Sequence, residues 1–251
     1  MRQKAWLYIC SAGRGLGDIL KFKQERVIYL LLLFYPLKAP SSGIIASMFK
    51  PIIWKTFPRD FLRIQIGFAL FGLSLALLMQ ANLGTGAWAV LEVGFSKLLK
   101  LTPGTMTVLS GFFVLTGALL MREQIGWGTL GNILSIGPWL DIALRFLPSV
   151  DNNLLVQIAM LLAAILMMGF ASAIYIGVNA GAGPRDSLML GLKRTTGISL
   201  RKARTIIEIT VVSIGWLIGG PAGIGTVVFA LLIGPAIQWA FKILKVEADH
   251  S

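Results

Sequence analysis

The chain has 251 residues, of which 56% are hydrophobic and only 14% are charged. A soluble domain would carry about 25% charged residues. Apolar runs of about 20 residues recur, each long enough to cross a bilayer core of roughly 30 Å. The composition therefore predicts an all-α, polytopic membrane protein whose surroundings are the lipid bilayer. We attribute the net charge of +12 to cytoplasmic loops rather than to nucleic-acid binding.

The residue types that most enzymes and metal sites need are nearly absent. The chain contains one cysteine, Cys10, and one histidine, His250. An intramolecular disulfide, a Ser-His-Asp triad and a His-ligated metal are therefore not expected. No nucleophile–base pair is visible either, so we expect no enzyme activity, no metal and no cofactor.

Residues 1–56 differ from the rest of the chain. Only residues 28–37 are continuously apolar, which is too short to span a bilayer, and they begin too late for a signal peptide. Two interpretations stay open. The region is a cytoplasmic extension that is partly disordered or lies on the membrane surface, or translation starts at Met48.

Two groups of apolar segments follow in chain order. Residues 57–149 contain predicted helices at 62–83, 87–99, 103–121 and 127–147, and residues 150–245 contain predicted helices at 154–178, 184–196, 203–217 and 224–243. Residues 246–251 form a short tail. The second helix of each group has about 13 residues, or roughly 20 Å, which is thin for a full crossing.

The two groups are similar in sequence when the chain is shifted by 97 residues, which aligns Asn82 with Asn179. Under this shift glycine meets glycine at positions 72, 84, 86, 94, 126, 128 and 137. Pro138 also meets Pro235. Such self-similarity predicts two fused structural repeats.

The distribution of Lys and Arg bears on the topology. If all eight segments cross, nearly every basic residue lies on one side, and only Arg122 and Arg185 lie on the other. The positive-inside rule then favours eight crossings with both termini in the cytoplasm. Four crossings per repeat predict parallel repeats, related by an axis along the membrane normal.

Each repeat is interrupted between its first two helices by an Asn-x-Gly-x-Gly segment. Glycine permits such a turn, and irregular backbone inside a membrane is tolerated where it is buried in protein or lines a wet cavity. The free N–H groups of the two short helices would then converge on a polar or anionic solute. The predicted substrate-binding residues are Asn82, Gly84, Gly86, Asn179, Gly181, Gly183, Arg185 and Asp186.

The segments "ANLGTGAW", "GAGPRDSLM", "IGWGTLGN" and "GGPAGIGTVVFALLIGP" carry a family resemblance. Over about residues 57–245 the chain resembles the YczE/YyaS/YitT family of bacterial membrane proteins. The resemblance implies an integral inner-membrane protein and a transporter, and implies no chemistry. Ala87 and Ala89 depart from the proline and aspartate that the family tends to carry there.

Several residues of the predicted spans have a structural and a functional interpretation. Arg185 and Asp186 form a local salt bridge or cap, or a gating or binding pair. Glu92 and Glu208 couple transport to a proton or ion, or are neutral groups bonded to a neighbouring helix. The Gly–Pro pairs at Gly137 and Gly234 allow close packing and a kink, or act as hinges.

We therefore predict a transporter or permease of an unknown small polar or anionic solute. The alternative is a non-transporting scaffold or regulatory subunit of a partner protein, because repeats and broken helices can be purely structural. A homo-oligomer or a membrane partner is compatible with either function.

Overall fold

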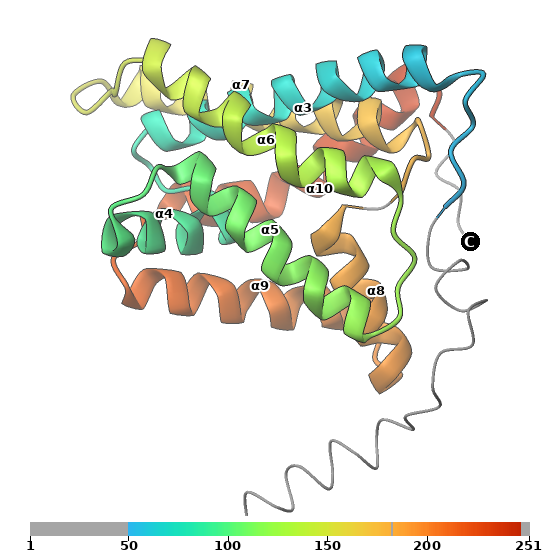
Figure 1. The fold of residues 1–251 in the computed structure, drawn as a ribbon. Helices are drawn as coiled ribbons and strands as arrows, with labels where there is room; N and C mark the ends of the chain where they lie inside the picture. The colour runs from blue at the N-terminus through green and yellow to red at the C-terminus, as the bar shows by residue number, and fades with distance from the viewer. Residues whose placement is uncertain (1–49, 182, 247–251) are drawn as a thin grey trace, which may run out of the picture. The chain divides into compact units, whose positions relative to one another are not determined.

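The computed structural model describes residues 50–181 and 183–246, which form eight α-helices and no β-strand (Figure 1). The interpretations of residues 1–47 lie outside the described residues. The helices are α3 (Phe57–Gln80), α4 (Ala87–Leu99), α5 (Pro103–Leu120), α6 (Trp127–Phe146), α7 (Leu154–Ile176), α8 (Pro184–Thr196), α9 (Leu200–Leu217) and α10 (Ile224–Leu244). The all-helical fold is confirmed.

Side-chain caps explain where some of the helices begin. The hydroxyl of Thr102 accepts a hydrogen bond from the N–H of Thr105 (3.1 Å) and caps α5. The hydroxyl of Ser199 accepts from the N–H of Lys202 (3.4 Å), and α9 consequently begins at Leu200, earlier than the predicted residue 203.

Four of the described helices, α3, α5, α7 and α10, are long and apolar enough to cross a membrane. Many of their large apolar side chains are also exposed, among them Phe113, Leu155 and Leu231. Exposed apolar surface on this scale is stable in lipid rather than in water. The chain is therefore a multi-pass membrane protein.

The bundle of described helices has two ends, which we call A and B. At end A, Lys50 precedes α3, and its Nζ donates to Oδ1 of Asn179, which follows α7 (2.9 Å). Lys50 also donates its backbone N–H to the carbonyl of Ile125, just before α6 (2.9 Å). At end B, the side-chain amide of Gln80 at the end of α3 donates to the carbonyl of Leu147, just after α6 (2.7 Å). Helices α3 and α6 therefore run from A to B, and α7 runs from B to A.

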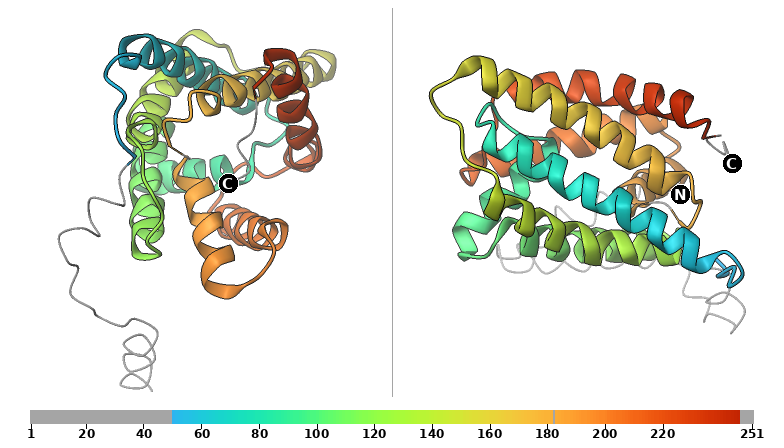
Figure 2. Two further views of the ribbon diagram at one scale, coloured as in Figure 1. Left: turned by 90° about the vertical axis from the view of Figure 1, so that its right-hand side faces the viewer. Right: turned by 90° about the horizontal axis from the view of Figure 1, so that it is seen from above.

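Helix α10 runs in the same direction as α7. At end B, the N–H of Gly225 in its first turn donates to the carbonyl of Leu83 (2.7 Å). At end A, Val246 after its last turn lies against Gly177, which follows α7. Seen from above, α6, α3, α7 and α10 lie side by side in that order (Figure 2, right).

The short helices α4 and α8 begin inside the bundle and leave it at opposite ends (Figure 1). Helix α4 ends at B, where Nζ of Lys97 donates to the carbonyl of Gly219 (3.1 Å). Helix α8 ends at A, where Arg194 forms an ion pair with Glu123 (3.0 Å). Each short helix therefore returns to the end from which the chain entered.

These directions correct the predicted topology. Helices matched by the 97-residue shift, α3 with α7 and α6 with α10, are antiparallel, so the halves are inverted and not parallel. Eight full transits are also wrong, because α4 and α8 turn back. The charge argument failed because Arg122 also changes sides. When the short helices turn back, Lys97, Lys100 and Arg145 move to end B, but Arg122 joins the basic end A. The charge bias therefore survives either topology.

Small residues set the spacing of the central helices. A Cβ on Gly72 of α3 would lie 2.7 Å from Cβ of Trp139 on α6, and one on Gly169 of α7 would lie 2.9 Å from the carbonyl carbon of Ala236 on α10. Position 236 is the 97-residue counterpart of position 139. Glycine therefore permits the close approach of both helix pairs. The core between them includes Phe68, which has no exposed surface.

Candidate functional site

A cavity of about 960 Å³ lies at the centre of the bundle, and every described helix lines it. Figure 2 (left) looks along the helices from end A and shows how they surround this region. Most of the wall is apolar, as at Leu75, Ile133 and Ile233. A few polar and charged side chains converge within it, which is the usual character of a small-molecule site.

The interruptions before α4 and α8 bring the starts of these helices into the cavity. Asn82 and Gly84 have positive φ (51° and 106°), as do Asn179 and Gly181 (55° and 126°). The carbonyl of Ala180 accepts from the N–H of Gly128 (3.0 Å), which matches the Gly225–Leu83 bond in the other half. Each interrupted segment therefore bonds to a loop of the opposite half, which satisfies backbone groups that the helix break leaves free.

Glycine is required at these interruptions by both conformation and space. A Cβ on Gly84 would lie 2.6 Å from the backbone nitrogen of Gly223, and one on Gly181 would lie 2.6 Å from Cα of Gly126. L-residues also rarely adopt these φ values. The matched glycines thus hold each break against the opposite half.

The first turns of α4 and α8 meet across the cavity. The guanidinium of Arg185 on α8 lies 5.0 Å from the ring centre of Trp88 on α4, a cation–π contact. In sequence these two residues are counterparts under the 97-residue shift. Gly86 and Gly183, which precede the two helices, also line the cavity.

Arg185 pairs with Glu92 of α4, not with the adjacent Asp186. Glu92 is 1% exposed. Its carboxylate also accepts hydrogen bonds from the hydroxyls of Thr107 (2.9 Å) and Ser110 on α5. The carboxylate therefore bonds to side chains of two other helices, and Arg185 stands between it and the cavity.

Asp186 lines the cavity and keeps an accessible surface. No described residue donates a hydrogen bond to its carboxylate. The position that a Cβ on Gly183 would occupy lies 3.2 Å from Oδ2 of Asp186, 3.8 Å from the hydroxyl of Tyr175 and 4.0 Å from the amide nitrogen of Asn132. Three polar groups from α8, α7 and α6 thus surround one point.

Helix α9 contributes a second ion pair to the wall. Nε of Arg204 lies 2.8 Å from Oε1 of Glu208, one helical turn away, and both residues line the cavity. Their side chains are 48% and 31% exposed, so both keep accessible surface beside the cavity. Glu208 therefore carries a charge that is already balanced by its own helix.

The cavity unites part of the predicted site. Gly86, Gly183, Arg185, Asp186 and Glu208 line it, and Glu92 lies directly behind Arg185. Gly84 and Gly181 pack against the opposite loops instead.

The two asparagines lie outside the cavity, at opposite ends of the bundle. The side-chain amide of Asn82 donates to the hydroxyl of Ser149 and to Asp151 at end B, both at 2.6 Å, and Asn179 binds Lys50 at end A. Their positive φ and loop contacts fit the turn itself.

Among the lining residues that sequence reasoning did not single out are Trp88, Asn132, Tyr175 and Arg204. The spacing of Arg204 and Glu208 could have identified that pair, because residues four apart face each other on a helix. Asn132 and Tyr175 carry no such signal, since each is one of several polar residues scattered along a mostly apolar helix.

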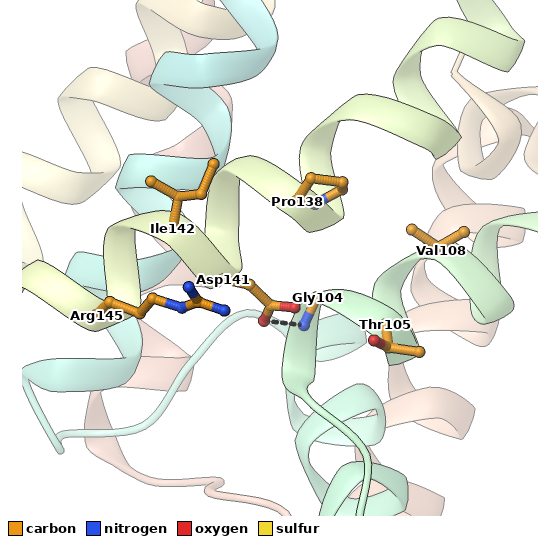
Figure 3. A pocket seen from close by; sticks show the side chains of 7 residues that line it. All are labelled: Gly104, Thr105, Val108, Pro138, Asp141, Ile142 and Arg145. Atoms are coloured by element: carbon orange, nitrogen blue, oxygen red, sulfur yellow. Dashed lines mark hydrogen bonds between the residues drawn. The ribbon is translucent and has the colours of Figure 1, made fainter.

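Asp141, a carboxylate of the predicted spans, has a structural role in a smaller pocket of about 310 Å³ between α5 and α6. Figure 3 shows its side chain turned toward the start of α5. Its Oδ1 accepts from the N–H of Gly104 (2.8 Å), and its Oδ2 accepts from the hydroxyl of Thr102. The carboxylate therefore caps the helix N-terminus of a neighbouring element.

The two halves differ where their third and fourth helices meet. Helices α5 and α6 pack closely: a Cβ on Gly137 would overlap the carbonyl oxygen of Gly104, and Ile133 lies against Gly111. The counterparts α9 and α10 hardly touch within the described residues, and a Cβ on Gly234 would meet no described atom within 4 Å. Glu208 stands where α5 has Gly111. The cavity extends into the open α9–α10 seam.

Comparison of the sequence with known proteins identifies the family to which the chain belongs. A model described as "Family of unknown function (DUF6198)" matches residues 59–242. An uncharacterized protein of Haemophilus influenzae is 32% identical over 176 residues, which cover 70% of this chain and 80% of that protein. The uncharacterized membrane protein YczE of Bacillus subtilis is 29% identical and covers 68% of this chain and 79% of its own length.

A third relative, the uncharacterized protein YyaS of Bacillus subtilis, is 27% identical over 72% of this chain and 91% of its own length. No solved structure gives a significant match. The resemblance drawn from the glycine-rich motifs is confirmed.

Proposed function

Because the chain belongs to the DUF6198 family, whose function is unknown, we propose its function from its geometry: it is a transporter that carries a small polar or charged solute through the central cavity. The observation that carries this proposal is the contrast between the two seams. One seam, α5–α6, is closed, and its counterpart in an inverted half, α9–α10, is open.

In the membrane, six helices cross the bilayer: α3, α5, α6, α7, α9 and α10. Helices α4 and α8 are re-entrant from opposite faces, and their N-termini meet near the midplane. Inverted repeats with broken helices at the midplane are a common design of secondary transporters. The equivalent glycine contacts at Gly84–Gly223 and Gly181–Gly126 support this arrangement.

End A faces the cytoplasm of a bacterial inner membrane. The positive-inside rule supports this orientation, because end A and the loops joined to it carry most of the basic residues. These residues are Lys50, Lys55, Arg59, Arg122, Lys193, Arg194, Lys202, Lys242 and Lys245. Of the basic residues that the structure describes, only Lys97, Lys100 and Arg145 lie near end B.

Transport follows from an exchange of conformations between the halves. In the state described, the cavity extends between α9 and α10, and Arg204 in the second turn of α9 lies near end A. When α9 closes on α10 and α5 separates from α6, the same cavity opens toward end B. The two states have matched contacts because the halves are related in sequence, so a small free-energy difference separates them.

Within this cycle, Arg185 and Asp186 bind the solute, and Gly86 and Gly183 let it approach the backbone of the two short helices. Glu92 and Glu208 are the coupling carboxylates. Glu208 is the better placed of the two, because it keeps accessible surface beside the cavity and its partner Arg204 can release it when α9 moves.

Paired cysteines test the exchange, with Cys10 replaced by serine. A Cβ on Gly111 would lie 3.4 Å from Cβ of Ile133, which suits a disulfide, so Gly111→Cys with Ile133→Cys links α5 to α6 readily. The matched pair, Glu208→Cys with Ala230→Cys, occupies the counterpart positions in the open seam. We expect it to link only when α9 closes on α10.

Accessibility then reports which face the cavity meets. Ser172→Cys places a thiol on the cavity wall. A membrane-impermeant thiol reagent should label it from both faces of oriented vesicles, and from the end A face alone when α5 and α6 are linked. Labelling from one face regardless of either link would overturn transport and favour the scaffold alternative.

A further inference from the structure

We propose that the transported solute is a zwitterion, a small molecule that carries one carboxylate and one ammonium group. The inference rests on the proposed function, since it names the class of solute that the central cavity takes. It follows from two binding groups of opposite character that diverge from adjacent residues, Arg185 and Asp186.

The anion subsite lies at the start of α4. The first N–H groups of a helix have no acceptor within it, and this end carries partial positive charge. The first turn of α4 contains no acidic residue, and its N-cap, Gly86, has no side chain to neutralise that charge. Arg185 brings a guanidinium to the same place, over Trp88.

Arg185 keeps hydrogen-bonding capacity for a ligand. A guanidinium has five N–H donors, and in the described part of the chain Arg185 uses Nη2 for Glu92. Its side chain is 26% exposed, whereas that of Glu92 is 1% exposed. A solute carboxylate can therefore bind the open side of the fork while Glu92 holds the other side.

The cation subsite lies around Gly183. The Asp186 carboxylate faces the cavity without a hydrogen bond from any described residue. Tyr175 is only 9% exposed, yet its hydroxyl makes no hydrogen bond within residues 50–181 and 183–246 and points to the same space. Both oxygen groups are therefore open to the cavity and free to bond to a ligand that enters it. An ammonium group fits, because all three of its N–H groups seek acceptors.

The free donors and acceptors of the wall disfavour a simple ion. The remaining charged side chains of the wall, Arg204 and Glu208, neutralise each other. A bare anion would meet the carboxylate of Asp186, and a bare cation would leave the free donors of Arg185 and of the α4 N-terminus without an acceptor. A zwitterion satisfies both subsites, and the apolar wall near Phe229 and Ile233 accommodates its carbon skeleton.

The test uses the purified full chain in detergent and measures binding by calorimetry and by thermal stabilisation. The probes are the twenty common amino acids and glycine betaine. The best binder is then compared with two analogues, one without its amino group and one without its carboxylate. We expect each analogue to bind at least ten-fold more weakly than the zwitterion.

Two variants assign the subsites. Asp186→Asn should weaken the zwitterion and strengthen the acid-only analogue, because it removes the carboxylate that repels an anion, so that the two bind about equally. Tyr175→Phe should weaken the zwitterion and the amine-only analogue by the same factor, which a merely structural role would not do. Equal binding of the zwitterion and the acid-only analogue, or no binding by any probe, overturns the inference. Neither result affects the cysteine-accessibility test, so failure of the transport proposal remains distinguishable.

Discussion

The ion pair between Arg185 and Glu92 gives the sharpest test of the site's energetics. Arg185→Ala leaves the Glu92 carboxylate in a site that is 1% exposed, with only the hydroxyls of Thr107 and Ser110 as donors. Removing one partner of a buried pair costs about 3–5 kcal/mol, because the remaining charge stays buried. At roughly 2–4 °C per kcal/mol, the melting temperature should fall by about 6–20 °C.

The opposite substitution should cost less. Glu92→Gln leaves the Arg185 guanidinium without its anion, but that side chain is 26% exposed and reaches the water of the cavity. The double variant Arg185→Ala with Glu92→Gln should regain stability relative to Arg185→Ala alone, since no buried charge remains.

Thermal unfolding of the four proteins in one detergent measures this cycle. If Arg185→Ala melts within about 2 °C of the parent protein, or if adding Glu92→Gln lowers its melting temperature further, then the carboxylate is not held as a buried charge. The account of the α4–α8 contact would then be wrong.

Three further substitutions, two of them with a matched control, test the glycines and the interhelical cap. Gly84→Ala should cost several times the roughly 1–2 kcal/mol typical of left-handed backbone alone, because its Cβ would meet the Gly223 backbone. Gly197→Ala (φ 72°) should cost only that backbone strain, because no described atom lies within 4 Å of the added Cβ. Denaturant titrations of the two variants measure the difference in unfolding free energy. Asp141→Ala should destabilise by about 1–2 kcal/mol through the lost cap of α5, seen as a lower melting temperature. Gly137→Ala should abolish folding or shift the resting state by forcing α5 from α6, whereas Gly234→Ala should behave as the parent in thermal unfolding and size-exclusion chromatography.

The sequence alone determined the local structure of this protein closely. The predicted segment 127–147 corresponds to α6 (Trp127–Phe146), and segment 184–196 to α8 (Pro184–Thr196). Such boundaries are readable because apolar runs end at Gly, Pro and Asn, whose effects on the backbone are local. The paired breaks were visible for the same reason, as was the position of Arg185 and Asp186 directly after the second break.

Only the tertiary structure decided where the chain goes after each break. Gly84 permits a turn, but whether α4 continues across or returns depends on the loop at Gly223, far along the sequence. The partner of Arg185 was equally hidden: Asp186 is adjacent in sequence, yet helix geometry directs the two side chains apart, and Glu92 comes from the other half. Local dihedral preferences act over a few residues and can therefore be read from one segment of sequence. Helix direction and charge pairing depend on packing between the two halves, so they cannot be read from either half alone.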